Sequence, residues 1–280
     1  LHETKSGKEL RTLQDNAQLR ERLAKLSYGP KEFFTVRTAD GVELNAWMVK
    51  PADFNAKKKY PVLMTQYSGP NSQSVLDRFE FGWEECLAAH GVITVCVDGR
   101  GTGARGEEFR KCTYLKMGDL ESKDQVAAAK ALAKQFPFVD ASRMAIWGWS
   151  FGGYNTLMSM SVGEGTFKVG IAVAPPTDWH YYNTIYTERY MRTPKENAEG
   201  YALTSPIKLA EKLTGKLLLI HGTADDNVHF MQTMDYAETL VQLGKQFDMQ
   251  VYKDRNHFIM GGNTRLHLYT RMTDFILENL

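Results

Sequence analysis

The feature that most constrains the fold of this chain is an alternation, from Tyr60 onward, of short apolar runs with longer helix-like segments. The apolar runs are YPVLMTQY (60–67), VITVCVD (92–98), RMAIWGW (143–149), VGIAVAP (169–175), KLLLIHG (216–222) and DMQVYKD (248–254). The helix-like segments are 74–89, 118–134, 151–162, 228–243 and 265–279. Because strands separated by helices pair in parallel and are covered on both faces, the alternation predicts an α/β fold with a mostly parallel central sheet and helices on both faces.

Three segments lie outside this alternation. Residues 31–51 hold two β-like runs around Asp40-Gly41, which predicts a hairpin. Residues 8–26 place leucines among charges, as in an amphipathic or linking helix. We expect a linking helix within residues 1–30 and a single α/β domain over 31–280. Residues 176–212, rich in Tyr, Thr and Pro, predict a helical excursion over the sheet edge that receives substrate.

Composition excludes several classes of protein. The 34 Lys and Arg balance the 33 Asp and Glu, so we expect no nucleic-acid partner. The 3 cysteines have no C-x-x-C spacing, which argues against a disulfide scaffold and a structural zinc site. No apolar stretch approaches the length of a membrane span, so we expect none in this chain.

A glycine-rich stretch, DGRGTGARG (98–106), matches the dinucleotide-loop pattern G-x-G-x-x-G at Gly101, Gly103 and Gly106. A dinucleotide loop opens directly into a helix, and an acidic residue closes the next strand. Here EEFRKCTYLKMGDLE intervenes without an apolar stripe. We therefore interpret the stretch as a turn at the edge of the site and not as a dinucleotide loop. For the chain as a whole we expect neither an organic cofactor nor a metal.

A second motif, G-x-S-x-G, spans Gly148 to Gly152 and contains Ser150. It is either a glycine-rich bend with an incidental hydroxyl or a sharp turn that presents a nucleophile. The motif closes a predicted strand and opens a predicted helix, as a nucleophile elbow requires. A serine hydroxyl also needs a base and an acid, which would follow later strands in the order Ser, Asp or Glu, His.

Both partners are present in that order. Asp225 follows the run 216–222; it either caps the helix expected near Val228, or turns inward while Asp226 or Asn227 caps. Among 7 histidines only His257 follows a strand after the acid, and His221 precedes the acid. The sequence therefore predicts a catalytic triad of Ser150, Asp225 and His257.

Longer motifs then become recognisable. GWSFGGY, AVAPPTDWHYYNTIYTERYM, HGTADDNVHF and YSGPNSQ resemble the C-terminal hydrolase domain of the dipeptidyl peptidase IV family, serine peptidases of the prolyl oligopeptidase clan. The resemblance runs from about residue 10 to the C-terminus. It implies an α/β-hydrolase fold, a catalytic domain over 31–280, and release of N-terminal X-Pro or X-Ala dipeptides through an acyl-enzyme. A bacterial member of the family is expected.

The resemblance also assigns residues that bind substrate. It implies that the Tyr67 hydroxyl and the Phe151 backbone N–H form the oxyanion hole, and that Asn227 binds the substrate backbone. The residues it places around a proline slot are Phe151, Trp179, Tyr182, Tyr186 and Val228. The spacing of Trp179, Tyr182 and Tyr186, i, i+3, i+7 on a helix, by itself more often marks a core stripe.

This sequence departs from the family pattern at several positions. Phe151 replaces a tyrosine, Pro176 stands where valine is usual, and Val169 replaces a disulfide cysteine. The family holds the substrate N-terminus with two glutamates of an N-terminal β-propeller, which we expect to be absent from these residues. Alternative functions are a prolyl tripeptidyl or acylaminoacyl peptidase and a catalytically silent binding subunit. A homodimer and a periplasmic or secreted location are expected by resemblance, although cytoplasmic relatives exist.

Overall fold

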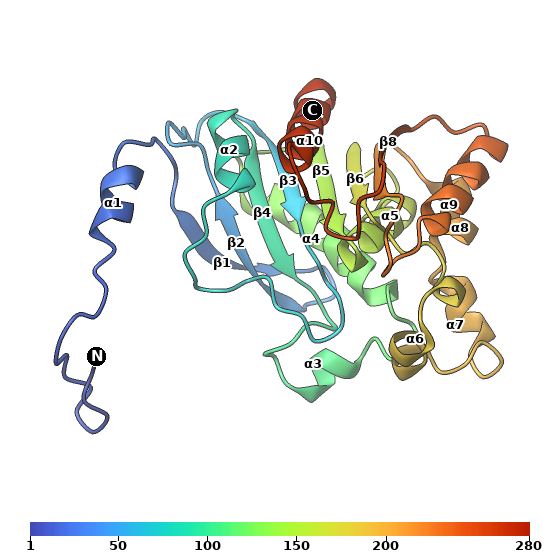
Figure 1. Cartoon of the computed structure of the whole chain (residues 1–280), viewed down its shortest axis with the longest axis horizontal. Helices are drawn as coiled ribbons and strands as arrows, with labels where there is room; N and C mark the ends of the chain where they lie inside the picture. Colours follow the sequence, from blue (N-terminus) through green and yellow to red (C-terminus); the bar gives the residue numbers. More distant parts are fainter.

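The computed structural model describes residues 1–280, in which eight strands form one sheet in the order β1-β2-β4-β3-β5-β6-β7-β8 (Figure 1). The strands are β1 (Lys31–Arg37), β2 (Glu43–Val49), β3 (Tyr60–Thr65), β4 (Ile93–Asp98), β5 (Val139–Trp149), β6 (Val169–Val173), β7 (Lys216–Gly222) and β8 (Asp248–Tyr252). β2 pairs antiparallel with β1 and β4, and every other neighbouring pair is parallel. The predicted α/β fold, its parallel strands and the hairpin are confirmed.

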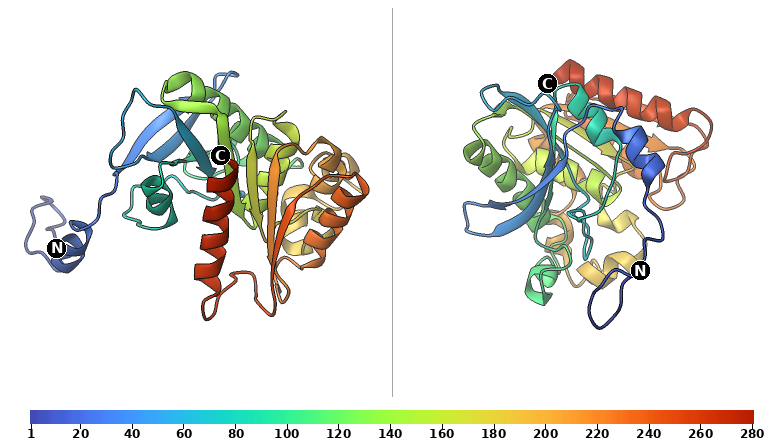
Figure 2. Two further views of the ribbon diagram at one scale, coloured as in Figure 1. Left: turned by 90° about the horizontal axis from the view of Figure 1, so that it is seen from above. Right: turned by 90° about the vertical axis from the view of Figure 1, so that its left-hand side faces the viewer.

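Long helices cover both faces of the sheet. α2 (Trp83–Ala89) and α10 (Thr264–Asn279) bury their apolar side chains on one face. α4 (Asp119–Gln135), α5 (Phe151–Val162) and α9 (Met231–Gln242) pack on the other. Figure 2 shows α10 and α4 on opposite sides of the strands. Because each helix supplies an apolar stripe to a sheet with two buried faces, the central strands lose their polar alternation.

The expected excursion between β6 and β7 is present as a group of short helices. These are α6 (Thr184–Met191), α7 (Ala198–Leu203) and α8 (Pro206–Leu209), with 3-10 turns at Trp179–Tyr181 and Ala210–Lys212. α6 and α7 lie beyond the ends of β5 and β6, near the five-residue helix α3 (Glu107–Lys111) (Figure 1). The excursion therefore adds walls to the end of the sheet at which the parallel strands finish.

Two predicted helices are shorter than expected. α2 begins at Trp83 instead of residue 74, because the Asp98 carboxylate accepts the backbone N–H groups of Ser74 and Val75 and holds that segment in an irregular path. The predicted helix over 8–26 is reduced to α1 (Ala17–Leu23), which buries no residue. This N-terminal segment extends away from the sheet (Figures 1 and 2), so its leucines have no apolar surface to cover.

The three cysteines are free thiols, and Cys96 is buried in the core on β4. None of the helices has both the length and the apolar content needed to cross a membrane.

Candidate active site

Ser150 occupies a strained turn between β5 and α5. Its φ is 59° and its ψ −119°, a conformation that side chains rarely adopt. The flanking glycines make the turn possible. A Cβ on Gly148 would lie 2.3 Å from the carbonyl carbon of Gly152, and one on Gly152 would lie 2.5 Å from the Gln66 carbonyl oxygen. The predicted strand-turn-helix setting of G-x-S-x-G is thus confirmed.

The turn leaves two polar groups free beside each other in the chain. Ser150 is half-buried, its N–H donates to the Val173 carbonyl over 2.8 Å, and its hydroxyl has no hydrogen-bond partner within the chain. Phe151 is the first residue of α5, so its backbone N–H has no acceptor within the helix. A negative charge that develops next to Ser150 would face this N–H at the positive end of the helix.

The predicted acid and base are in contact. Nδ1 of His257 lies 2.7 Å from Oδ2 of Asp225, and both side chains are buried. Asp225 follows β7 and His257 follows β8, while Ser150 follows β5. Because these strands run parallel, their carboxyl ends lie at one edge of the sheet, and the three residues are delivered to the same end of the molecule.

Asp225 has more partners than the sequence suggests. Its Oδ1 accepts the backbone N–H groups of Asn227 and Val228, each over 2.9 Å, and its Oδ2 also lies 3.1 Å from Nε2 of His221. Burial alone would raise the pKa of Asp225, but the hydrogen bonds from His221, His257 and the Asn227 N–H outweigh it and hold the pKa well below its ordinary value. The carboxylate therefore stays charged beside the imidazole.

One prediction about this loop is wrong. Neither Asp226 nor Asn227 caps a helix, because α9 begins only at Met231 and has no side-chain cap. Asp225 itself ties the turn and also faces His257. One carboxylate performs both tasks because its two oxygens point to different partners.

His221 is a partner of Asp225 that was not predicted from the sequence. The ring is fully buried at the end of β7; Nδ1 lies 2.7 Å from Oγ1 of Thr233, and Nε2 lies 2.8 Å from the Val228 carbonyl as well as near Asp225. The available signal was its position four residues before the acid, at the end of the same strand. Order along the chain excluded His221 as the base but did not exclude it as a partner of the acid.

Hydrogen bonds join the loops that carry the acid and the base. Nε1 of Trp149 donates to the His257 carbonyl over 2.9 Å, and the N–H of Ala224 donates to the Arg255 carbonyl over 3.1 Å. The guanidinium of Arg265 lies over the Trp149 ring, 4.8 Å from its centroid. The residue that precedes Ser150 thus fixes the loop that presents His257.

The aromatic residues assigned to substrate binding form one continuous group, which we call the aromatic cluster. Its members are Tyr67, Phe151, Trp179, Tyr182 and Tyr186. Trp179 lies at the centre: its ring centroid is 5.7 Å from that of Phe151 and 6.1 Å from that of Tyr186. Val228 is fully buried in the loop that carries Asp225. Although the Tyr67 side chain is 41% exposed, partial desolvation raises its pKa above the ordinary value of 10.0, and its hydroxyl keeps its proton at neutral pH.

The helical interpretation of this spacing is wrong. Trp179 belongs to a 3-10 turn, Tyr182 has an extended backbone, and Tyr186 lies in α6. The break allows the Tyr182 hydroxyl to reach the loop after β7, where it donates to Oδ1 of Asn227 over 2.6 Å. This hydrogen bond orients the Asn227 amide toward the aromatic cluster with its N–H₂ group available.

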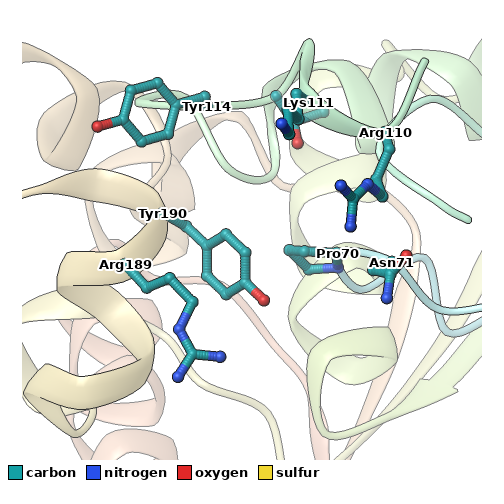
Figure 3. Close-up of a pocket in the computed structure, with 8 residues that line it drawn as sticks. Pro70, Asn71, Arg110, Lys111, Tyr114, Arg189 and Tyr190 are labelled. Atoms are coloured by element: carbon teal, nitrogen blue, oxygen red, sulfur yellow. The ribbon is translucent and has the colours of Figure 1, made fainter. Parts of the chain in front are cut away.

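A cavity of about 590 Å³ adjoins the aromatic cluster. It is lined by Pro70, Asn71, Arg110, Lys111, Thr113, Tyr114, Arg189 and Tyr190 (Figure 3). The ring of Tyr190 lies 5.0 Å from that of Tyr186, so Tyr190 separates the cavity from the cluster. Neither the charge of this cavity nor the contribution of Tyr190 was expected from sequence.

Comparisons with known proteins agree on one family. In Sus scrofa, dipeptidyl peptidase 4 is 40% identical over 282 residues, which cover 99% of this chain and 37% of that protein. The human prolyl endopeptidase FAP is 40% identical over 282 residues with the same coverage. The chain thus spans well under half the length of these curated relatives.

Solved structures agree with the sequence comparison. The crystal structure of Porphyromonas gingivalis dipeptidyl peptidase 4 has 59% identity and a TM-score of 0.96, and the match covers 100% of this chain and 40% of that one. A putative dipeptidyl aminopeptidase IV from Bacteroides ovatus has 36% identity and a TM-score of 0.88 over 92% of this chain and 37% of that one. The model of the prolyl oligopeptidase family matches residues 79–280, which hold five of the eight strands and Ser150, Asp225 and His257. The chain therefore belongs to the prolyl oligopeptidase family.

Proposed function

We propose that this chain carries the catalytic machinery of a serine peptidase that releases N-terminal X-Pro or X-Ala dipeptides. The observation that carries the proposal is the 2.7 Å contact between buried His257 and Asp225, at the sheet edge to which β5 delivers Ser150. The contact fixes the proton of the imidazole on Nδ1 and leaves Nε2 as an acceptor. Ser150 and His257 share no hydrogen bond in this structure, and such bonds often tighten only when substrate binds.

In the proposed reaction, Ser150 Oγ attacks the carbonyl carbon of the scissile bond while Nε2 of His257 takes the Oγ proton. The carbonyl oxygen becomes an oxyanion, to which the Tyr67 hydroxyl and the Phe151 N–H donate. The C–N bond then breaks as His257 returns the proton to the leaving amine. A water molecule then attacks the acyl carbon and gives a proton to His257. The bond between the acyl carbon and Ser150 Oγ breaks as His257 passes this proton to Oγ, which releases the dipeptide acid and restores the hydroxyl.

The aromatic cluster supports the choice of substrate. Proline offers a flat apolar ring and no N–H, so a slot beside the partly exposed Tyr182 and Tyr186 loses no hydrogen bond when proline enters, and the buried Phe151, Trp179 and Val228 form its apolar base. The smaller alanine fits the same slot with fewer contacts. Asn227, oriented by Tyr182, donates to a carbonyl of the substrate backbone.

Labelling with a fluorophosphonate tests the nucleophile. The parent chain should be labelled at Ser150, Ser150→Ala should not be labelled, and His257→Ala should react at least roughly a thousandfold more slowly because the base is gone. Ser142→Ala, an exposed serine on β5, is the control and should label normally. A parent chain that is never labelled would favour the alternative of a silent binding subunit.

Product analysis separates the remaining alternatives. Mass spectrometry of peptides cut by the whole protein should show dipeptides with proline or alanine in second position. Release of tripeptides or of acylated residues would instead indicate a prolyl tripeptidyl or acylaminoacyl peptidase. A homodimer and a periplasmic or secreted location stay predictions.

A further inference from the structure

The residues that line the cavity beside Tyr190 carry an excess of positive charge. Arg110, Lys111 and Arg189 line it, and none of its eight lining residues is acidic. The whole chain, by contrast, is almost neutral. Arg110 and Lys111 both pair with one carboxylate, that of Glu107, whereas Arg189 has no acidic partner within 4.0 Å. Three cations facing one carboxylate leave an excess of positive charge around the space.

The charged groups come from opposite walls. Arg110 approaches from α3 and Arg189 from α6, while the Tyr190 hydroxyl points between them toward Pro70 and Asn71 (Figure 3). Arginine is well suited to donate to carboxylate oxygens, and here α3 supplies one guanidinium while α6 supplies the other together with the Tyr190 hydroxyl.

Hydrogen bonds hold the walls in place without any ligand. The backbone N–H of Leu115 donates to the Tyr190 carbonyl over 2.8 Å and so ties the segment after α3 to α6. The N–H of Asn71 donates to the Gly101 carbonyl over 2.9 Å and fixes the third wall. Nε of Arg192 donates to the Tyr114 hydroxyl over 3.0 Å. A cavity with fixed walls loses little conformational entropy when it binds.

We propose that this cavity is a subsite for a carboxylate of the peptide substrate, an acidic side chain next to the residue held by the aromatic cluster. The proposal rests on the proposed function, because Tyr190 of the cavity lies with its ring centroid 5.0 Å from that of Tyr186, a member of the aromatic cluster. The carboxylate comes either from the N-terminal residue or from the residue after the scissile bond. In both cases it is drawn to Arg110 and Arg189 while the proline ring occupies the slot.

Isothermal titration into the Ser150→Ala form measures binding without turnover. The probes are two matched pairs: Glu-Pro-Gly-amide with Gln-Pro-Gly-amide, and Ala-Pro-Glu-amide with Ala-Pro-Gln-amide. In one pair the Glu peptide should bind about tenfold more tightly than its Gln counterpart, and the preference should weaken as salt is added. The pair that shows the preference identifies the position of the acidic residue.

Substitutions inside and outside the cavity test whether its arginines cause the preference for the Glu peptide. Arg110→Gln combined with Arg189→Gln should abolish the preference and leave the Gln peptides unaffected, with thermal melting confirming that the variant is folded. Arg105→Gln removes a nearby cation that does not line the cavity, and the preference should persist. Equal affinity within both pairs, absence of binding, or a preference that survives the double variant would overturn the proposal. Failure of fluorophosphonate labelling would instead count against the proposed function, because the titrations require no reaction.

Discussion

Asp225 shows how one side chain organises a site from several loops. Its two oxygens accept two backbone N–H groups of its own turn and contact two imidazoles. The hydrogen bonds within the turn hold the carboxylate in position independently of either histidine. Since both imidazoles contact the same oxygen, Oδ2, the position of His257 depends on the position of His221.

At this scale we predict that His221 is a positioning residue. His221→Leu removes a hydrogen bond to Asp225, so the pKa of Asp225 should rise and the fluorophosphonate labelling rate should fall by roughly tenfold or more. His221→Gln keeps an N–H donor near the position of Nε2 and should recover part of the rate. An unchanged labelling rate in the folded Leu variant, or no recovery of the rate in the Gln variant, would contradict this role.

Some residues of the candidate site could be predicted from the sequence and others could not. The placement of Ser150, Asp225 and His257 at one edge of the sheet could be predicted because each follows a strand, whereas their catalytic roles stay predictions. His221 and Trp149 could not be predicted, because their contribution lies in contacts between loops that are far apart in the chain. The apolar periodicity that locates strands carries no information about such contacts.

At the scale of elements, Tyr154 joins three of them. It is fully buried on α5, and its hydroxyl lies 2.8 Å from the Met117 carbonyl before α4 and 2.9 Å from the Thr204 carbonyl after α7. The excursion that walls the site is thereby attached to the helix that begins at Ser150.

We predict that Tyr154→Phe lowers the free energy of unfolding by about 1–3 kcal/mol, because the one buried O–H that the Met117 and Thr204 carbonyls share is lost while the ring volume is kept. Urea denaturation followed by tryptophan fluorescence measures the change. Tyr181→Phe, whose ring is largely exposed, is the control and should stay within about 0.5 kcal/mol of the parent. Equal effects of the two substitutions would show that the attachment contributes little.

Element boundaries were predicted well where apolar periodicity is strong. They were predicted poorly where a single polar side chain or local backbone geometry determines where a helix begins. The strands and α4, α5 and α10 lie close to their expected ranges. The late start of α2 depends on Asp98, and the break between Trp179 and Tyr186 depends on local backbone geometry. Neither cause produces a periodic pattern in the sequence.

At the scale of the whole molecule, one buried acid links folding to pH. Glu121 is fully buried on α4, and burial raises its pKa to about 8 although its carboxylate accepts the Gly118 N–H over 2.8 Å. Its ordinary value is 4.5. Between these pH values the folded chain keeps a proton that the unfolded chain has released, so unfolding releases a proton.

We therefore predict that the free energy of unfolding falls as pH rises from about 4.5 toward 8, with a contribution from Glu121 of up to about 1.4 kcal/mol per pH unit. Glu121→Gln cannot titrate and should flatten the curve across this window. Urea denaturation at a series of pH values measures both slopes. Parallel curves for the parent and the variant would show that Glu121 is not the group responsible.

The order of the strands has a further consequence for the base. β8 is an edge strand that is hydrogen-bonded to β7 alone, and the loop that follows it carries His257. A local opening of this edge breaks one ladder of hydrogen bonds instead of two, and it draws the imidazole away from Asp225 while the central strands stay packed. We therefore expect that, on warming, labelling of Ser150 is lost at a lower temperature than the folded core.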